Sequence, residues 1–337
     1  MSTGFLYDER YLLHHTADLP EQPERLSRLV EYLQSTGLLG RMAPLHPYAA
    51  PLEVVRLVHE EAYLNRIQEA VRRGETFVDS EEVQICADSW DVALLAAGGA
   101  MAACDAVMTS PAKASGAGRG VDNAFVAARP PGHHACRGTA MGFCLLNNVA
   151  IAARYVQQRY GLQRVAIVDW DLHHGNGTQD IFDDDASVLF VSLHEHPSFL
   201  YPGTGYAWEK GRGAGEGLTI NVPMPPEADD ADFQTAFANH VLPALRRFAP
   251  QFLLISAGFD AHADDPLGHL RLTSVGYAWM TRQLKNIAET YCQNRLVSIL
   301  EGGYNTQSLS WSVAAHLEVL LEPTLEQSLM DFKSGMY

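Results

Sequence analysis

The sequence lacks the basic surface that a nucleic-acid-binding protein needs. Its 337 residues contain 24 Lys and Arg against 40 Asp and Glu, which gives a formal net charge of −16 at pH 7. Proteins that bind nucleic acids use clustered Lys and Arg to neutralise phosphates, so this balance argues against a nucleic-acid partner. The electrostatic field of such an acidic chain instead favours a cationic substrate.

Cysteine is scarce, and its spacing is not that of a disulfide framework or a thiolate metal site. The five cysteines are odd in number and include no CxxC pair, so we expect reduced, mostly buried thiols. The first fifteen residues, MSTGFLYDERYLLHH, lack the basic region and the continuous apolar stretch of a signal peptide. Both features indicate a cytoplasmic protein. The cysteines are Cys86, Cys104, Cys136, Cys144 and Cys292.

Long hydrophobic runs are also missing. The longest, Val92 to Val107, carries Asp91 and Asp105 at its edges and is shorter than a membrane span. We expect it to form a buried core helix and expect no membrane association. With 47% hydrophobic and 19% charged residues, the composition is that of a soluble globular protein.

Apolar strands alternate with amphipathic helices along most of the chain. Helices between apolar strands indicate parallel crossovers, so we predict an α/β fold with a central, mostly parallel sheet and helices on both faces. We find no internal repeat and no linker and expect a single domain over residues 1–337, with residues 110–120, SPAKASGAGRG, as a connection. The predicted strands are a short one that starts at Asn123 and is stopped by Pro130 and Pro131, then 164–171, 188–194, 218–224, 252–260 and 296–304, and the predicted helices are 22–36, 59–73, 145–161, 230–247 and 273–290.

Polar side chains gather where the predicted strands end. Asp169, Asp171 and His173 follow one strand, Asp260 ends another, and residues 301–304, EGGY, end the last. Ligands of parallel sheets bind outside the carboxyl ends of the strands. We therefore predict the active site at this edge of the sheet.

The stretch VAIVDWDLHHGNGTQ, residues 165–179, holds the densest set of metal-ligating side chains. Asp171 and His173 are two residues apart, and on an extended chain such residues point to the same side. With Asp260 they make an Asp/His/Asp set, which is typical of a catalytic zinc site with one open position. The alternative interpretation is a capping and turn cluster without a metal.

Two further motifs favour amide hydrolysis. RPPGHH places His133 and His134 on a proline-braced loop, where an imidazole can take a proton from a metal-bound water and pass one to a leaving amine. EGGY places Tyr304 after two glycines, and its hydroxyl can donate to a developing oxyanion.

Five motifs in order, RPPGHHA, GFCLLNN, VDWDLHHGNGTQ, SAGFDAHADDPL and EGGY, resemble those of the zinc-dependent histone deacetylase superfamily. Trp170, Asn176 and Gln179 resemble the class II branch and its bacterial amidohydrolase relatives, which include acetylpolyamine amidohydrolases. YDERYLLHH and PERL resemble the family's N-terminal region, so the resemblance covers nearly the whole chain.

The resemblance implies a role for each catalytic side chain. His134 would be the general base and acid, and His133 would give electrostatic support. Asp169 would orient His133 as outer-shell carboxylates do. Asn176 stands where class I enzymes have an aspartate, so a neutral amide would hold His134 and stabilise its imidazolium less. Tyr304 would stabilise the oxyanion.

The resemblance also implies the metals. One zinc ion per chain would be bound by Asp171, His173 and Asp260. The family binds potassium beside the zinc, and the resemblance assigns that site to Asp169, Ser192 and Leu193 together with backbone oxygens of Asp171 and His173.

The resemblance further implies the substrate pocket. Gly142 and Phe143 match the wall of the family's acyl-lysine tunnel. Tyr201 lies in a Gly-rich segment suited to the pocket mouth. Leu267 stands where polyamine-specific relatives carry a glutamate, which argues against polyamines.

Two positions depart from the family pattern. Leu19-Pro20-Glu21 replaces the usual His-Pro-Glu, a change we expect to affect a loop or a subunit contact but not the chemistry. The acidic residue that holds the substrate backbone at the pocket rim has no clear counterpart, and either Glu82 or Asp88 could serve.

We therefore expect hydrolysis of an N-acyl amide on a lysine-like amine, with an acylated lysine, a polyamine or a similar small amide as substrate. An acetylpolyamine amidohydrolase is the nearest alternative. A binuclear hydrolase of the arginase type would need further carboxylates, whereas His262 stands where one is wanted. A catalytically inactive binding module would have lost one of these side chains. Self-association into a homo-oligomer is left open.

Overall fold

The computed structural model describes residues 2–17, 19–109 and 120–323. The strands are β1 (Thr3–Leu6), β2 (Ala43–Leu45), β3 (Phe77–Val78), β4 (Ser80–Gln84), β5 (Asn123–Val126), β6 (Val165–Asp169), β7 (Val188–Glu195), β8 (Thr219–Met224), β9 (Phe252–Ala257) and β10 (Leu296–Leu300). The helices are α1 (Glu24–Ser35), α2 (Leu52–Val55), α3 (Glu61–Arg73), α4 (Ser89–Met108), α5 (Asn148–Tyr160), α6 (Asn176–Phe182), α7 (Asp230–Ala236), α8 (Leu242–Phe248), α9 (Ser274–Tyr291) and α10 (Thr306–Leu321). Shorter helical turns are η1 (Glu9–Leu13), η2 (Leu39–Arg41), η4 (Gly213–Gly215) and the π-turn η5 (Phe237–Val241).

Eight strands form one sheet in the order β2-β1-β5-β10-β9-β6-β7-β8, and every neighbouring pair is parallel. Strands β5, β6, β7, β9 and β10 are buried along their whole length. Their near-continuous apolar sequence follows from this position, because a parallel sheet is covered on both faces. The predicted parallel α/β sheet is therefore confirmed.

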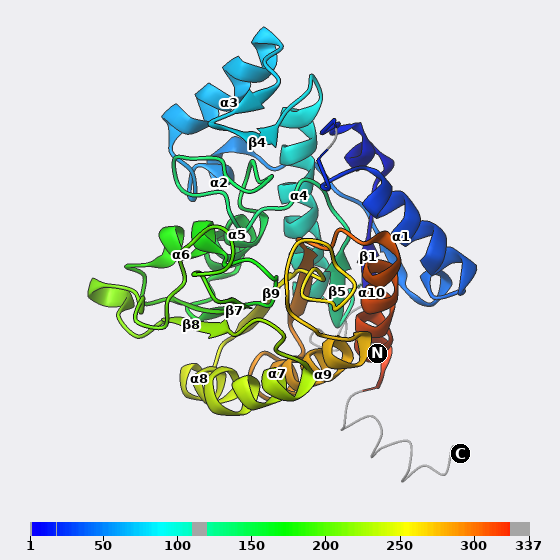
Figure 1. Ribbon diagram of the computed structural model, residues 1–337, viewed down its shortest axis with the longest axis vertical. Coiled ribbons are helices and arrows are strands. Elements are labelled where there is room, and N and C mark those ends of the chain that lie inside the picture. The colour runs from blue at the N-terminus through cyan, green and yellow to red at the C-terminus, as the bar shows by residue number, and fades with distance from the viewer. Residues whose placement is uncertain (1, 18, 110–119, 324–337) are drawn as a thin grey trace.

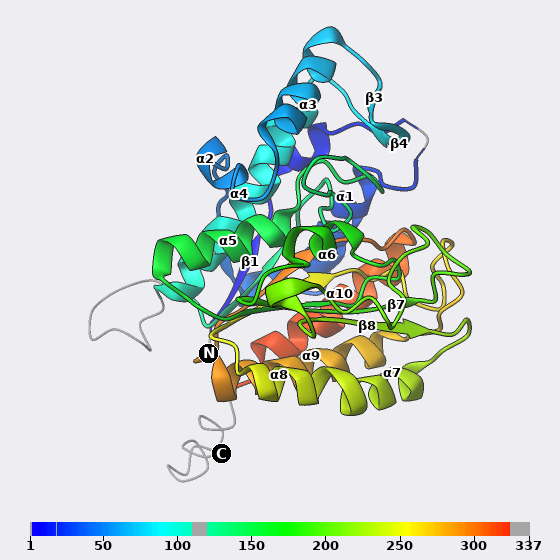
Figure 2. The same cartoon turned by 90° about the vertical axis from the view of Figure 1, so that its left-hand side faces the viewer.

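Helices cover both faces of the sheet (Figure 2). Helices α4, α5 and α6 pack on one face, and α9 and α10 lie on the other with α7 and α8 beside them. Helix α4 is long and apolar enough to span a bilayer, contrary to the prediction, but 67% of its most apolar window is buried inside the protein. That burial is typical of a core helix, as the sequence predicted.

Several boundaries differ from the predicted ones for a common reason. The strands predicted at 164–171, 252–260 and 296–304 end earlier, at Asp169, Ala257 and Leu300, because the polar residues that follow leave the sheet to form loops. The helix predicted over 230–247 is divided into α7, η5 and α8 by a π-turn. The predicted connection at 110–120 lies, except for Gly120, outside the described residues.

An arm formed by α3 and the β3–β4 hairpin projects from the sheet (Figure 1). The prediction missed this hairpin and the short strands β1 and β2, which carry too few residues for a clear alternation. Strand β4 carries Glu82, so the arm contributes an acidic side chain to the region beyond the carboxyl ends of the strands.

Candidate metal centre and catalytic site

Four loops that carry the conspicuous motifs follow four neighbouring strands. PPGHH follows β5, EGGY follows β10, GFD follows β9 and WDLHH follows β6, and these strands are adjacent in the order β5-β10-β9-β6. Because the strands are parallel, all four loops leave the same edge of the sheet. The topology thus gathers residues that are up to 171 positions apart, from His133 to Tyr304.

Asp171, His173 and Asp260 form a buried cluster with the geometry of a metal site. Their ligand atoms lie within 4.8 Å of one another. Nδ1 of His173 is 3.2 Å from Oδ1 of Asp171 and 3.2 Å from Oδ2 of Asp260. Two carboxylates, each 1% exposed, face one imidazole here. Burying these charges costs free energy unless a cation binds between them. The donor set fits a zinc ion.

The local backbone differs from the prediction. Asp171 and His173 do not alternate along a strand, because β6 ends at Asp169 and both residues lie in the bend that follows. The amide of His173 donates to Oδ1 of Asp171 at 2.8 Å, which folds the two side chains toward the same point. Burial would lower the pKa of His173, but the carboxylates of Asp171 and Asp260 outweigh it and raise that pKa to about 9.

The tandem histidines have different partners. Nδ1 of His133 lies 3.0 Å from the carboxylate of Asp169, and Nδ1 of His134 lies 2.6 Å from Oδ1 of Asn176. Burial tends to lower the pKa of His133, but the charges of Asp171 and Asp169 raise it well above the usual value. Burial together with the neighbouring charge of His133 lowers the pKa of His134 well below the usual value. These opposite pKa shifts favour a charged His133 and a neutral His134, so His134 is the imidazole that can accept a proton.

A buried carboxylate holds the histidine loop. Oε2 of Glu301 accepts the amides of Gly132 at 2.6 Å and His133 at 3.1 Å, and Oε1 accepts the hydroxyl of Ser256 at 3.1 Å. Burial raises the pKa of Glu301 to about 7. From the sequence, Glu301 was predicted only to lie at a strand end. Its position before two glycines, after an apolar strand, was the available signal.

Arg25 binds the loop of residues 301–304 that carries Tyr304. Its guanidinium donates to the carbonyls of Glu301 and Gly303, both at 2.6 Å, and lies 4.8 Å from the centre of the Tyr304 ring. Glu21 binds Arg25 at 3.0 Å and accepts two bonds of 2.6 Å from Arg129. Glu21 thus anchors the loop although its motif begins with leucine instead of histidine. Neither Arg25 nor Arg129 stands in a motif that predicted a role for it.

Two glycines allow the loops to approach the site. Gly142 has φ +51°, and a Cβ there would collide with the ring of His134. A Cβ on Gly302 would collide with the carboxylate of Asp260. Any larger residue would displace the side chain of His134 at position 142 or that of Asp260 at position 302.

A cavity of ≈190 Å³ opens onto His134 and His173. The predicted wall residues Gly142, Phe143, Tyr201 and Leu267 all line it, together with Glu82 and Tyr304. The hydroxyl of Tyr201 donates to Glu82 at 2.9 Å. Asp88 lies at the start of α4 beside a separate cavity, so of the two candidates for the acidic rim residue only Glu82 reaches the pocket.

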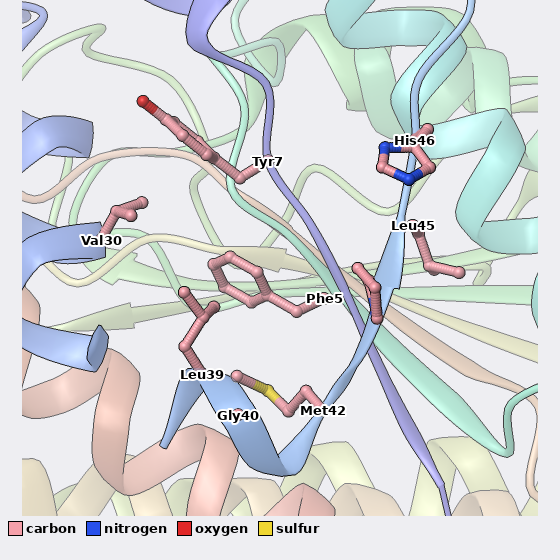
Figure 3. A pocket seen from close by; sticks show the side chains of 9 residues that line it. Phe5, Tyr7, Val30, Leu39, Gly40, Met42, Leu45 and His46 are labelled. Atoms are coloured by element: carbon pink, nitrogen blue, oxygen red, sulfur yellow. The ribbon is translucent and has the colours of Figure 1, made fainter. Parts of the chain in front are cut away.

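A larger groove of ≈450 Å³ lies elsewhere, between β1, β2 and the segment from α1 to η2 (Figure 3). Phe5, Leu39 and Met42 converge on its apolar centre, and His46 lies across from Tyr7. It contains no cluster of acid, base and metal-ligating groups, so size alone does not identify the reactive site.

The residues predicted to bind potassium lie on the neighbouring strands β6 and β7. Asp169 and Ser192 are paired across β6 and β7, and Leu193 follows Ser192. His262 does not join a second metal cluster, since Asp171, His173 and Asp260 form the only such group in the described ranges. Its Nδ1 instead accepts the amide of Asp264 at 3.1 Å.

Comparisons with known proteins agree with one another. The family model described as "Histone deacetylase domain" matches residues 19–320. A "Probable deacetylase" of Archaeoglobus fulgidus is 42% identical over 91% of this chain and 82% of that protein. A "Histone deacetylase-like amidohydrolase" of Pseudomonas aeruginosa is 36% identical over 98% of this chain and 89% of that protein. The crystal structure of an HDA15 HD domain superposes with a TM-score of 0.87 at 38% identity, covering 98% of this chain and 93% of that one.

Proposed function

We propose that this chain, which belongs to the histone deacetylase family of amide-bond hydrolases, is a zinc-dependent deacylase of acetyl-lysine-like amides. One observation carries the proposal. His173, which belongs to the buried cluster with Asp171 and Asp260, lines a pocket that His134 and Tyr304 also line. A metal site, a proton acceptor and an oxyanion donor therefore meet in one cavity.

Asp171, His173 and Asp260 would hold the zinc, which when bound supplies a water of lowered pKa and polarises the substrate carbonyl. His134 takes a proton from the attacking water at Nε2, because its Nδ1 is engaged by Asn176. The hydroxyl of Tyr304 donates to the oxygen on which charge develops. The C–O bond forms, the C–N bond breaks, and His134 returns the proton to the leaving amine.

The pocket walls support a substrate with a narrow apolar stem. Phe143, Leu267 and Tyr201 leave ≈190 Å³, and Glu82 is an acceptor for an N–H group or a cation on the remainder of the substrate. A lysine side chain has such a stem. Because Leu267 is apolar, it gives no charged partner to the second amine of a polyamine, and we therefore rank acyl-lysine above acetylpolyamines. We further propose potassium at Asp169, Ser192 and Leu193.

Metal content and substrate preference test this proposal together. The chain is stripped with a chelator, reloaded with zinc in potassium buffer, and assayed on an acetyl-lysine peptide, an acetylpolyamine and a longer acyl-lysine. We expect one zinc per chain by mass spectrometry and fastest acetate release from the peptide. Asp171→Asn should lose the zinc, and the exposed Asp184→Asn should retain it. Two tightly bound metals per chain, or no release from any substrate, would contradict the proposal.

A further inference from the structure

Asp265 is a buried side chain that joins two loops of the site. It lies in the loop between β9 and α9 and is 7% exposed. Oδ2 of its carboxylate accepts the amide of Tyr304 at 2.7 Å and that of Asn305 at 3.2 Å. Oδ1 accepts the amide of Leu267 at 3.1 Å. One side chain thus holds backbone groups of two loops that are separated by more than thirty residues.

The residues held in this way lie on the wall of the same pocket. Tyr304 and Leu267 both line the ≈190 Å³ cavity, and they reach it from different loops. The side-chain amide of Asn305 also donates to the carbonyl of Asp264 at 3.0 Å, so the start of α10 is bound to this loop twice. We propose that Asp265 is a positioning residue that sets the place of Tyr304 relative to the metal ligand Asp260. This inference rests on the proposed function, in which Tyr304 donates to the oxyanion.

Tyr304 needs such a restraint because the backbone before it is irregular. Gly303 has φ +124°, a region open to glycine, and the chain enters α10 only at Thr306. The Tyr304 ring contacts the Arg25 guanidinium at 4.8 Å and the Phe143 ring at 5.8 Å. These contacts limit the tilt of the ring, whereas Asp265 holds the backbone from which the ring extends. An oxyanion donor acts through such preorganisation.

A carboxylate suits this position better than an amide. Both of its oxygens accept hydrogen bonds, so it can face Tyr304 and Asn305 on one side and Leu267 on the other. An asparagine of the same shape has a single acceptor oxygen, and its NH₂ group would oppose a backbone N–H on one side. Asp265→Asn therefore perturbs the loops without changing the side-chain volume.

Steady-state kinetics on the zinc-loaded enzyme test the proposal in two backgrounds. In the native background, Asp265→Asn should lower kcat by about 10- to 100-fold, since a displacement of about 1 Å can cost that much, while KM changes less than about threefold. In the Tyr304→Phe background the same substitution should lower kcat by no more than about twofold, because residues that act through one another are not additive. Asp264→Asn, whose side chain is exposed, is the matched control.

Amide hydrogen exchange tests the same contact without the reaction. A peptide covering residues 301–309 should exchange about tenfold faster or more in Asp265→Asn and unchanged in Asp264→Asn, because buried amides exchange only after local opening. If Asp265→Asn does not fold, Asp265→Ser, which keeps one acceptor oxygen, is used instead of Asp265→Asn in the kinetic and the exchange measurements. Equal kcat losses in the two backgrounds, or unchanged exchange, would overturn the proposal. If the native enzyme hydrolyses no acyl-lysine, the proposed function fails, and the exchange result still decides the role of Asp265.

Discussion

Nδ1 of His134 lies 2.6 Å from the side-chain oxygen of Asn176. The amide nitrogen of Asn176 points instead to the sulfurs of Met141 at 3.3 Å and Cys136 at 3.5 Å, which are weak acceptors. Since an amide oxygen only accepts, this arrangement assigns the proton of His134 to Nδ1 and leaves Nε2 as the free base. The partner is neutral, so it fixes the tautomer without adding the charge that an aspartate would bring.

Removing this partner should slow the reaction while leaving the metal in place. We expect Asn176→Ala to lower kcat by about 10- to 100-fold, as loss of a partner that orients a histidine does, because His134 then samples both tautomers. Asn286→Ala, on the exposed side of α9, is the control. Steady-state kinetics with zinc content measured in parallel check this, and an unchanged kcat would show that the Asn176 contact is dispensable.

Tyr304→Phe should separate chemistry from metal binding. The substitution removes one oxyanion donor, which is worth about 10² to 10³ in kcat, and it leaves Asp171, His173 and Asp260 intact. Zinc content should therefore equal that of the native chain. Tyr291→Phe, at the end of α9, controls for loss of a tyrosine hydroxyl far from the pocket. A native kcat in Tyr304→Phe would remove the tyrosine from the mechanism.

Glu82→Gln should weaken recognition of a substrate that carries an N–H donor or a cation beyond its acylated amine. Hydrogen bonds to charged groups contribute roughly 1.5–3 kcal/mol, and partial exposure of Glu82 reduces this, so we expect kcat/KM for an acetyl-lysine peptide to fall about threefold to tenfold. A neutral acylated alkylamine should be affected less than twofold. Glu81→Gln, the exposed neighbour on β4, is the control. Equal losses on both substrates would assign Glu82 a structural role.

His316 should make the protein less stable in mild acid. It is fully buried between the hydroxyls of Thr281 and Ser298, at 2.7 and 2.9 Å, and burial lowers its pKa from 6.5 to about 3. Because the folded pKa is below the unfolded one, its contribution is complete above pH 6.5 and is lost as the pH falls toward 3.

At pH 5 that loss amounts to roughly 2 kcal/mol of unfolding free energy, at about 1.4 kcal/mol per pH unit below the unfolded pKa. Urea unfolding at pH 7.5 and pH 5 measures it. The decrease between the two pH values should be about 2 kcal/mol smaller in His316→Gln than in the native chain. The exposed His240→Gln should show the native decrease. The same decrease in both variants would contradict the assignment of His316.

The sequence by itself determined the local parts of the site. Buried strands of a parallel sheet must be apolar throughout, so the runs before Asp169, Asp260 and Glu301 identified strands and placed polar residues at their carboxyl ends. Asp171 and His173 are only two residues apart. Their side chains therefore come together in the bend that the structure has, as they would have done on the extended strand that was predicted.

Only the tertiary structure decided which distant segments meet. Strands β9 and β10 insert between β5 and β6, which places Asp260 beside Asp171 although they are 89 positions apart in the sequence. The same packing selected Glu82 over Asp88, placed Arg25 beneath Tyr304 and brought Asp265 to the amide of Tyr304. None of these contacts produces a periodic pattern in the sequence. Each depends on the order of the strands and on loops that fold over the edge of the sheet, and burial of the whole core sets both.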